Sequence, residues 1–126
     1  MDEIATLRLR TLRMLLRRST VPLVVIDESA SLEDVRRVVR ERHAPLVVVV
    51  NAAQALLGTV SPAQLAGDDG APARVAALRA EEDVDATAAR VIAEDLAYVL
   101  VIESTGELIG ILSAAAITAR PARRAA

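Results

Sequence analysis

The same order of sequence signals occurs twice in this chain of 126 residues, and the two copies align without a gap at an offset of 52 positions. Gly58 corresponds to Gly110, and Ser61 corresponds to Ser113. Each copy contains a capped helix, a buried strand, a turn, a strand with a glycine and a second capped helix. Identity between the copies is low, so the order of these signals is the evidence for a repeat. It predicts two similar α/β units.

Short apolar runs mark the strands of the first unit, which we expect from 21 to 65. These runs are 21–27, 46–50 and 56–60. Ser31 begins a helix in the manner of a capping box, and Pro45 ends it. Ser61 caps a short second helix, with Gln64 at the reciprocal position of a capping box.

The second unit, expected from 74 to 118, repeats this order with strands at 75–78, 98–102 and 108–112. Asp83 caps its first helix, and Ser113 caps a last helix that should run until Pro121. Glycine, aspartate and proline make 66–73 the linker between the units, and 119–126 is expected to be a frayed tail.

An amphipathic pattern predicts an N-terminal helix within 1–20. Its leucines fall near helical spacing, with arginines distributed around them. The arginines could form a phosphate-binding arm, but the chain is acidic overall, with a net charge of -2, which favours a solvated helix face.

A single unit cannot easily bury both faces of its sheet. Two units packed together can share one core, which predicts a mixed α+β fold with pseudo-two-fold symmetry. Equivalent segments of the two units should line a cleft between them, and such junctions are common ligand sites.

Residue types that the chain lacks restrict its function. It has no cysteine and no lysine, His43 is its only histidine and Tyr98 its only aromatic residue. Few residues are therefore available to form a metal site or a catalytic pair of nucleophile and general base. Few are available to stack on the bases of a nucleic acid. We expect no enzyme activity, no required cofactor, no metal, no nucleic-acid partner, no membrane span and a cytoplasmic location.

The end of each unit resembles the CBS domain, a regulatory module named after cystathionine β-synthase. That family places an acidic or amide residue after an apolar strand and then closes a second strand as glycine, two apolar residues and threonine or serine. The second unit shows this as Glu103 followed by Gly110-Ile111-Leu112-Ser113. The first shows Asn51 followed by Gly58-Thr59-Val60-Ser61, with the same spacing of seven. The resemblance covers residues 11–119 and implies a tandem CBS pair of βαββα-type repeats.

The resemblance implies an adenosine-type nucleotide in the cleft between the repeats, with AMP, ADP, ATP and S-adenosylmethionine as the candidates. The ligand-binding residues implied are Ser61, Gln64, Ser113, Tyr98 and Thr20. The family also carries an aspartate three residues after the serine. This chain departs from that pattern, because Gln64 and Ala116 stand there, and we expect the first site, with Ser61 and Gln64, to be the stronger candidate.

Two functions follow from these features. The first is a regulatory module that senses a nucleotide, and the second is a degenerate module that binds no nucleotide and acts in dimerisation or partner docking. Both predict a homodimer, with a protein partner regulated in trans as a further expectation. The apolar helix faces that could fill either the core or an interface are Val35, Val38 and Val39 in one unit and Ala88, Val91 and Ile92 in the other.

Overall fold

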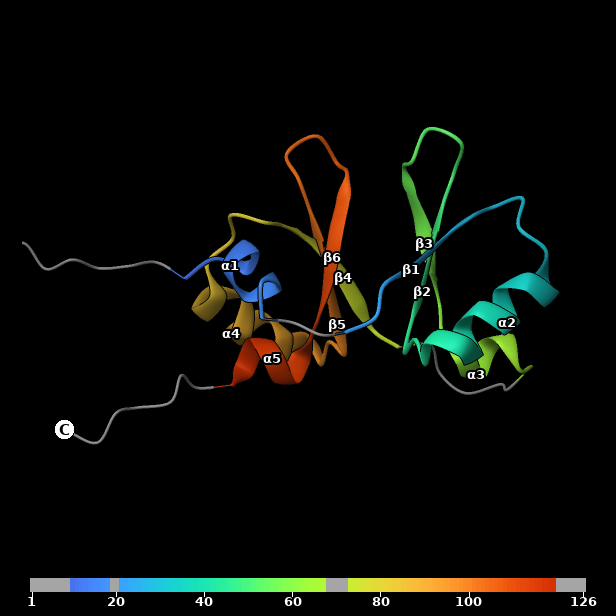
Figure 1. Cartoon of the computed structure of the whole chain (residues 1–126). Helices are drawn as coiled ribbons and strands as arrows, with labels where there is room; N and C mark the ends of the chain where they lie inside the picture. The colour runs from blue at the N-terminus through green and yellow to red at the C-terminus, as the bar shows by residue number, and fades with distance from the viewer. Residues whose placement is uncertain (1–9, 19–20, 68–72, 120–126) are drawn as a thin grey trace, which may run out of the picture.

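The computed structural model describes residues 10–18, 21–67 and 73–119. Its first unit contains β1 (Val24–Asp27), α2 (Leu32–Arg42), β2 (Val47–Val50), β3 (Leu56–Val60) and α3 (Pro62–Leu65). Its second unit contains β4 (Val75–Arg79), α4 (Val84–Glu94), β5 (Tyr98–Ile102), β6 (Leu108–Ser113) and α5 (Ala114–Thr118). A short helix, α1 (Leu12–Leu16), precedes both units. The predicted mixed α+β fold of two repeated units is confirmed (Figure 1).

Each unit has a three-stranded sheet with its middle strand parallel to one neighbour and antiparallel to the other. The two registers agree at the repeat offset, because Val24 pairs with Val47 as Ala76 pairs with Val99. Each antiparallel pair also carries an irregularity at the same place, next to Val50 in β2 and next to Ile102 in β5.

The repeat extends to unusual backbone conformations. His43 and Asp95 end α2 and α4 in the left-handed region, with φ of 51° and 54°. Gln54 and Gly106, in the two hairpin turns, also have positive φ. These equivalent pairs show that the two units share their turns as well as their element order.

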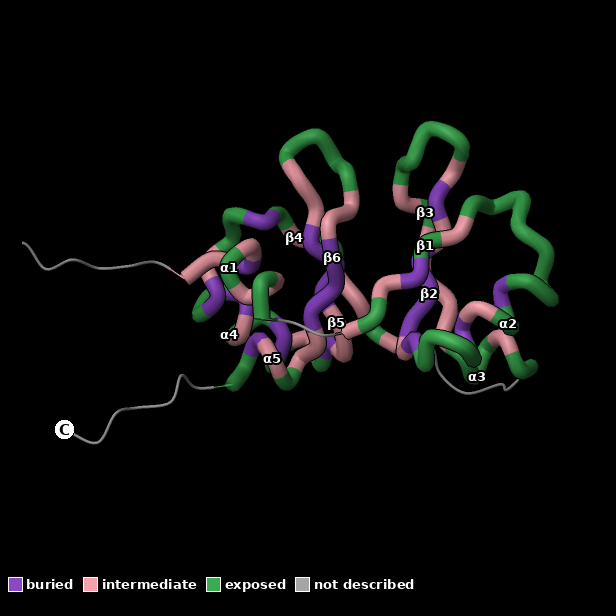
Figure 2. Tube along the Cα trace, viewed as in Figure 1, coloured by how far each residue is buried: buried purple, intermediate pink, exposed green. Residues whose placement is uncertain are grey.

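Alternation along the strands divides the core into three clusters. On the outer faces, Val47 of β2 packs with residues of α2, and Val99 of β5 packs with residues of α4 and α5. On the inner faces, Val48 of β2 and Leu100 of β5 belong to one cluster that both units share. Figure 2 shows this buried band along the middle strands, with exposed hairpin turns at one end. The predicted shared core is therefore present.

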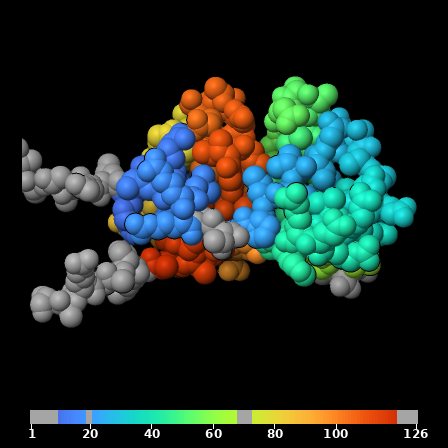
Figure 3. All heavy atoms as spheres, in the orientation of Figure 1, coloured from blue at the N-terminus to red at the C-terminus, as the bar shows by residue number. Residues whose placement is uncertain are grey.

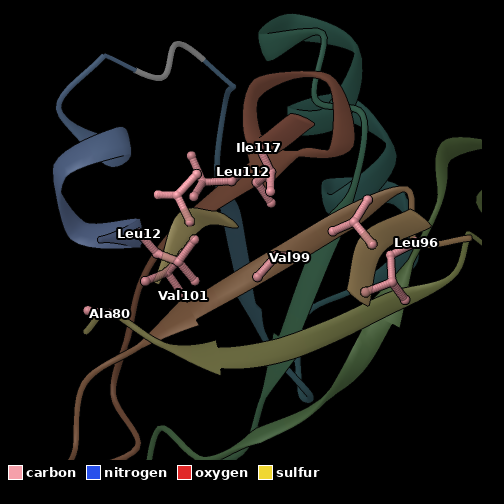
Figure 4. Packing of buried hydrophobic residues seen from close by; sticks show 9 residues of the cluster. Leu12, Ala80, Leu96, Val99, Val101, Leu112 and Ile117 are labelled. Carbon is pink, nitrogen blue, oxygen red and sulfur yellow. The ribbon is translucent and has the colours of Figure 1, made fainter. Parts of the chain in front are cut away.

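Helix α1 belongs to the second unit's core, although it precedes the first unit in the chain. Its Leu12 is completely buried beside Ala80 and Val101, as Figure 4 shows. In the space-filling view α1 lies against the second unit (Figure 3).

The ends of some elements differ from the sequence-based expectation. The N-terminal helix was expected over 2–18, and the described part is helical only over Leu12–Leu16, with 1–9 and 19–20 outside the described residues. Helix α5 ends at Thr118, before the expected stop at Pro121, and Ala119 after it has an extended backbone conformation. Most of the 66–73 linker, including Asp68, also lies outside the described residues. No helix in the described part of the chain is long and apolar enough to cross a membrane.

Candidate functional site

The two predicted serines lie at the ends of strands whose inner faces meet between the units. Ser113 is the last residue of β6 and pairs with Tyr98, the first residue of β5. Directly paired residues share a face of a sheet, and so do residues two apart on one strand. Ser113 therefore lies on the face of Ile111, which packs in the shared core.

Ser61 has the corresponding position in the first unit. It follows β3 directly, two residues after Thr59, which pairs with the buried Val48 of β2. Each serine therefore lies between the last strand of its unit and the helix that follows, at the inner face of the sheet. The sequence predicted this equivalence.

Both serine hydroxyls cap the helix that follows. Ser113 Oγ accepts a hydrogen bond from the Ala116 amide at 3.1 Å, and Ser61 Oγ accepts one from the Gln64 amide at 3.2 Å. A hydroxyl retains a donor and a further acceptor lone pair after one such bond. Capping therefore leaves each serine able to donate to a ligand.

The Gln64 side chain is held in place by a hydrogen bond to the protein backbone. Its Oε1 accepts a hydrogen bond from the Ser61 backbone amide at 2.9 Å, which completes the predicted capping box. This uses one lone pair of the amide oxygen on the protein's own backbone. Ala116 stands at the same position of the second unit and has no polar side chain to use in this way.

A small groove lies next to the second unit's site, and its walls combine apolar side chains with exposed polar atoms of the backbone. It has a volume of about 180 Å³ and is lined by Leu16, Val21, Leu23 and the 109–111 segment of β6. The same strand carries Ser113 two residues further on. Ligand pockets usually measure about 300–1,000 Å³, so this groove fits the base of a nucleotide better than the whole molecule.

Tyr98 lies beside this region, but it is half-buried and packs against the core shared by the two units. Thr20 lies outside the described residues. The structure thus groups Ser113 with Tyr98, and Ser61 with Gln64.

A larger cleft separates the two units at the opposite end of the strands. It has a volume of about 650 Å³, and its lining includes the equivalent segments 54–56 and 106–108 from the two hairpins. The predicted cleft with equivalent walls therefore exists. Ser61 and Ser113 do not line it, because they lie at the other ends of β3 and β6.

Arg74 is a candidate source of positive charge near Ser113. Its backbone carbonyl accepts a hydrogen bond from the Ala97 amide at 2.7 Å, directly before Tyr98. The exposed Arg74 side chain therefore starts close to the second unit's site. Arg79 is less suitable, because it stands at the far end of β4 and pairs with Ile102.

The structure adds residues that sequence reasoning did not assign to the site. Leu16 and Leu23 both line the groove. The amphipathic pattern of the N-terminal segment shows that its leucines need an apolar partner, but it does not show which unit supplies that partner.

Among the described residues, no group of three histidine, cysteine or acidic side chains is close enough to hold a metal ion. His43 is exposed at the end of α2.

Two repeated α/β units with a shared inner core define a tandem-repeat fold, and the comparisons identify it. The model of the CBS domain family matches residues 15–67. A search of curated proteins finds no match. Among solved structures, CBSX2 in complex with AMP has a TM-score of 0.64 and 20% identity, over 85% of this chain and 92% of that chain.

Two further structures have the same fold. The CBS domain of a putative transporter from Clostridium difficile 630 has a TM-score of 0.65 and 19% identity, over 86% of this chain and 90% of that one. The cytosolic domain of the Mg²⁺ channel MgtE, in complex with ATP, has a TM-score of 0.63 and 23% identity, over 75% of this chain. The match spans only 43% of that MgtE chain. Residues 15–67 thus match the CBS domain family, and the chain has the fold of a CBS pair.

Proposed function

We propose that this protein is a non-enzymatic, cytoplasmic regulatory module that binds an adenosine-type nucleotide between its two repeats. The observation that carries the proposal is the groove beside Ile111, on the same strand as the Ser113 hydroxyl. The groove takes the base, and Ser113 donates to the sugar or phosphate oxygens. The AMP and ATP complexes of proteins with this fold support the ligand class.

The geometry favours the second unit's site over the first. Gln64 already accepts a hydrogen bond from Ser61, whereas the groove and Arg74 both adjoin the side of Ser113 and Tyr98. The sequence-based preference for Ser61 and Gln64 stays a prediction, and variants at both serines compare the two sites.

Isothermal titration calorimetry of the full chain with AMP, ADP, ATP and S-adenosylmethionine tests the proposal. Ser113→Asp separates ligand binding from capping, because aspartate is also a good N-cap but repels a phosphate. We expect it to weaken nucleotide binding about tenfold or more, while Ser61→Asp leaves binding within twofold. Binding of none of the four ligands contradicts the proposal, and the opposite ranking of the two variants places the site at Ser61.

A dimerisation or docking module is the second candidate, and one observation favours it. Val35, Val39 and Val91 fill the cores of their units, but Ile92 on α4 is 72% exposed. The apolar helix faces that the sequence left undivided therefore separate into core residues and at least one surface residue. Ile92 is a candidate contact of a two-fold homodimer or of a protein partner regulated in trans.

Light scattering on the full chain and on Ile92→Asp tests this second candidate. A dimeric mass that falls to the monomer in the variant supports it. Ala93→Asp, at an exposed position of the same helix, is the matched control because it adds the same single negative charge. A monomeric wild-type chain would contradict the homodimer.

A further inference from the structure

Helix α1 is attached to the second repeat by backbone hydrogen bonds. The Leu12 amide donates to the Glu82 carbonyl at 3.1 Å, and the Arg13 amide donates to the Ala80 carbonyl at 2.9 Å. The Val84 amide donates in return to the Arg10 carbonyl at 2.8 Å. These bonds fix α1 on the connection between β4 and α4.

Side chains strengthen this attachment at one point. The Arg13 guanidinium donates to Glu81 at 2.8 Å and also to Glu103, which follows β5. These hydrogen bonds, with that of Glu81 the larger cause, raise the pKa of Arg13. Arg13 thus joins α1 to two separate segments of the second repeat.

The last turn of α1 forms a wall of the groove proposed above. Leu16 lines that groove together with Val21 and Leu23, and it covers Gly110 on β6. The equivalent glycine of the first repeat, Gly58, has no described atom within 4 Å of the place where a Cβ would stand. In the described structure, α1 therefore covers β6 at Gly110, whereas β3 is uncovered at Gly58.

A helix of five residues is not stable by itself in water, so α1 keeps its shape through these contacts. The start of α1 is anchored by the completely buried Leu12, whereas the Arg13 side chain is 42% exposed. Local opening of the last turn of α1, which carries Leu16, should therefore need less free energy than release of the whole helix. A base that packs against Leu16 gains this contact only in the attached state, and it must then shift the equilibrium toward attachment.

We propose that α1 is a strap that closes the groove beside Ser113, and that Arg13, as a positioning residue, holds it closed. Attachment of α1 limits entry into the groove, and occupancy of the groove stabilises the attachment. The nucleotide part of this inference rests on the proposed function, whereas the closure of the groove by α1 does not.

The absence of native cysteine allows a direct test without ligand. A reporter thiol from Ile109→Cys lies in the groove, and its alkylation rate with iodoacetamide reports access. Adding Arg13→Glu replaces two ion pairs with two repulsions, and we expect alkylation about tenfold faster. Arg17→Glu makes the same charge change at the C-cap of α1, at a residue without an ion pair among the described residues, and it should leave the rate within twofold.

Circular dichroism checks that each variant is folded. Leu16→Ala is the second variant, because it shortens the wall without touching Arg13, and it should also speed alkylation severalfold. Equal alkylation rates in the Arg13→Glu and Arg17→Glu proteins, or no change with Leu16→Ala in a folded protein, would overturn the strap.

Hydrogen exchange with AMP as the probe tests the coupling. We expect AMP to slow exchange of the α1 amides in the wild-type chain, and Arg13→Glu to weaken AMP binding about tenfold. If AMP binds by calorimetry but α1 exchange is unchanged, the coupling is wrong and the proposed function stands. If AMP does not bind, the nucleotide proposal fails for AMP, and the alkylation comparison still decides whether α1 closes the groove.

Discussion

Leu16 and Gly110 approach so closely that a Cβ atom added to Gly110 would lie 2.5 Å from Leu16 Cδ2. Carbon atoms in ordinary van der Waals contact are about 3.5–4.0 Å apart. The strand β6 therefore needs glycine at this position because a helix from outside its own repeat lies on it. The internal symmetry of the chain provides the control, since Gly58 occupies the same strand position with an open surface.

The first prediction compares alanine at these two glycines. Gly110→Ala should lower the free energy of unfolding by about 1 kcal/mol, since Leu16 must move to admit the methyl group. Gly58→Ala should leave it unchanged or slightly higher, because alanine restricts the unfolded chain and meets nothing in the fold. Urea denaturation of both variants measures the difference.

A double variant identifies the cause. Gly110→Ala combined with Leu16→Ala should cost less than the sum of the two single changes, because the shortened side chain leaves room for the new methyl group. Strict additivity would show that Gly110 is required for a reason other than Leu16.

The sequence predicted the repeated part of the fold well, because each signal has a local physical cause. Continuous apolar runs such as Val47–Val50 are buried on both faces, and they became the middle strands. Ser31, Asp83 and Ser113 each accept the expected capping hydrogen bond from a backbone amide. Local sequence is sufficient for features of this kind.

The attachment of α1 could not be predicted in the same way. Its leucines show an apolar face, but contacts such as Leu12 with Ala80 join residues far apart in the chain. No periodic pattern specifies such a partner. The same limit applies to the candidate site, because the sequence located Ser113 and Tyr98 but not the groove wall formed by Leu16.

Asp95 provides a prediction about stability. It ends α4 with φ of 54°, a backbone conformation that costs little free energy for glycine and more for other residues. Its negative charge also lies at the negative end of the helix dipole, which is unfavourable. Asp95→Gly should raise the free energy of unfolding by about 1 kcal/mol. His43→Gly, at the equivalent end of α2, should gain less because no unfavourable charge is removed. Thermal melting of both variants checks the ranking, and a lower melting temperature for Asp95→Gly would contradict it.

The pKa of Asp27 should lie below its usual range. Its Oδ1 accepts hydrogen bonds from the Ser29 backbone amide at 2.9 Å and from the Ser29 hydroxyl at 2.8 Å, and these bonds favour the charged carboxylate. Because the pKa of Asp27 is lower in the folded state than in the unfolded state, the ionised carboxylate stabilises the fold at pH values above the unfolded-state pKa. This contribution is lost as the pH falls through the folded-state pKa, below about pH 4. NMR titration of the carboxyl carbon measures it.

Ser29→Ala tests the cause of that shift. It removes the hydroxyl bond but keeps the backbone bond, so the pKa of Asp27 should rise only part of the way to its usual range. Ser104→Ala, in the second hairpin turn, is the control and should not move it. A pKa of Asp27 that is unchanged by Ser29→Ala would assign the whole shift to the backbone amide.

The last prediction restores a carboxylate where the CBS pattern has one. Ala116 lies in the first turn of α5, three residues after Ser113, and Ala116→Asp places an acceptor for ribose hydroxyls beside the proposed site. We expect AMP binding to tighten about tenfold, measured by calorimetry.

Ala115→Asp is the control, because it puts the same charge in the same turn of α5. An acidic residue near a helix N-terminus stabilises the helix in either variant, so this control separates a change in stability from a change in binding. If both variants change AMP affinity equally, the effect comes from charge and not from contact with the ribose. If neither variant binds AMP more tightly than the wild-type chain does, the groove beside Ser113 does not hold the nucleotide in the proposed orientation.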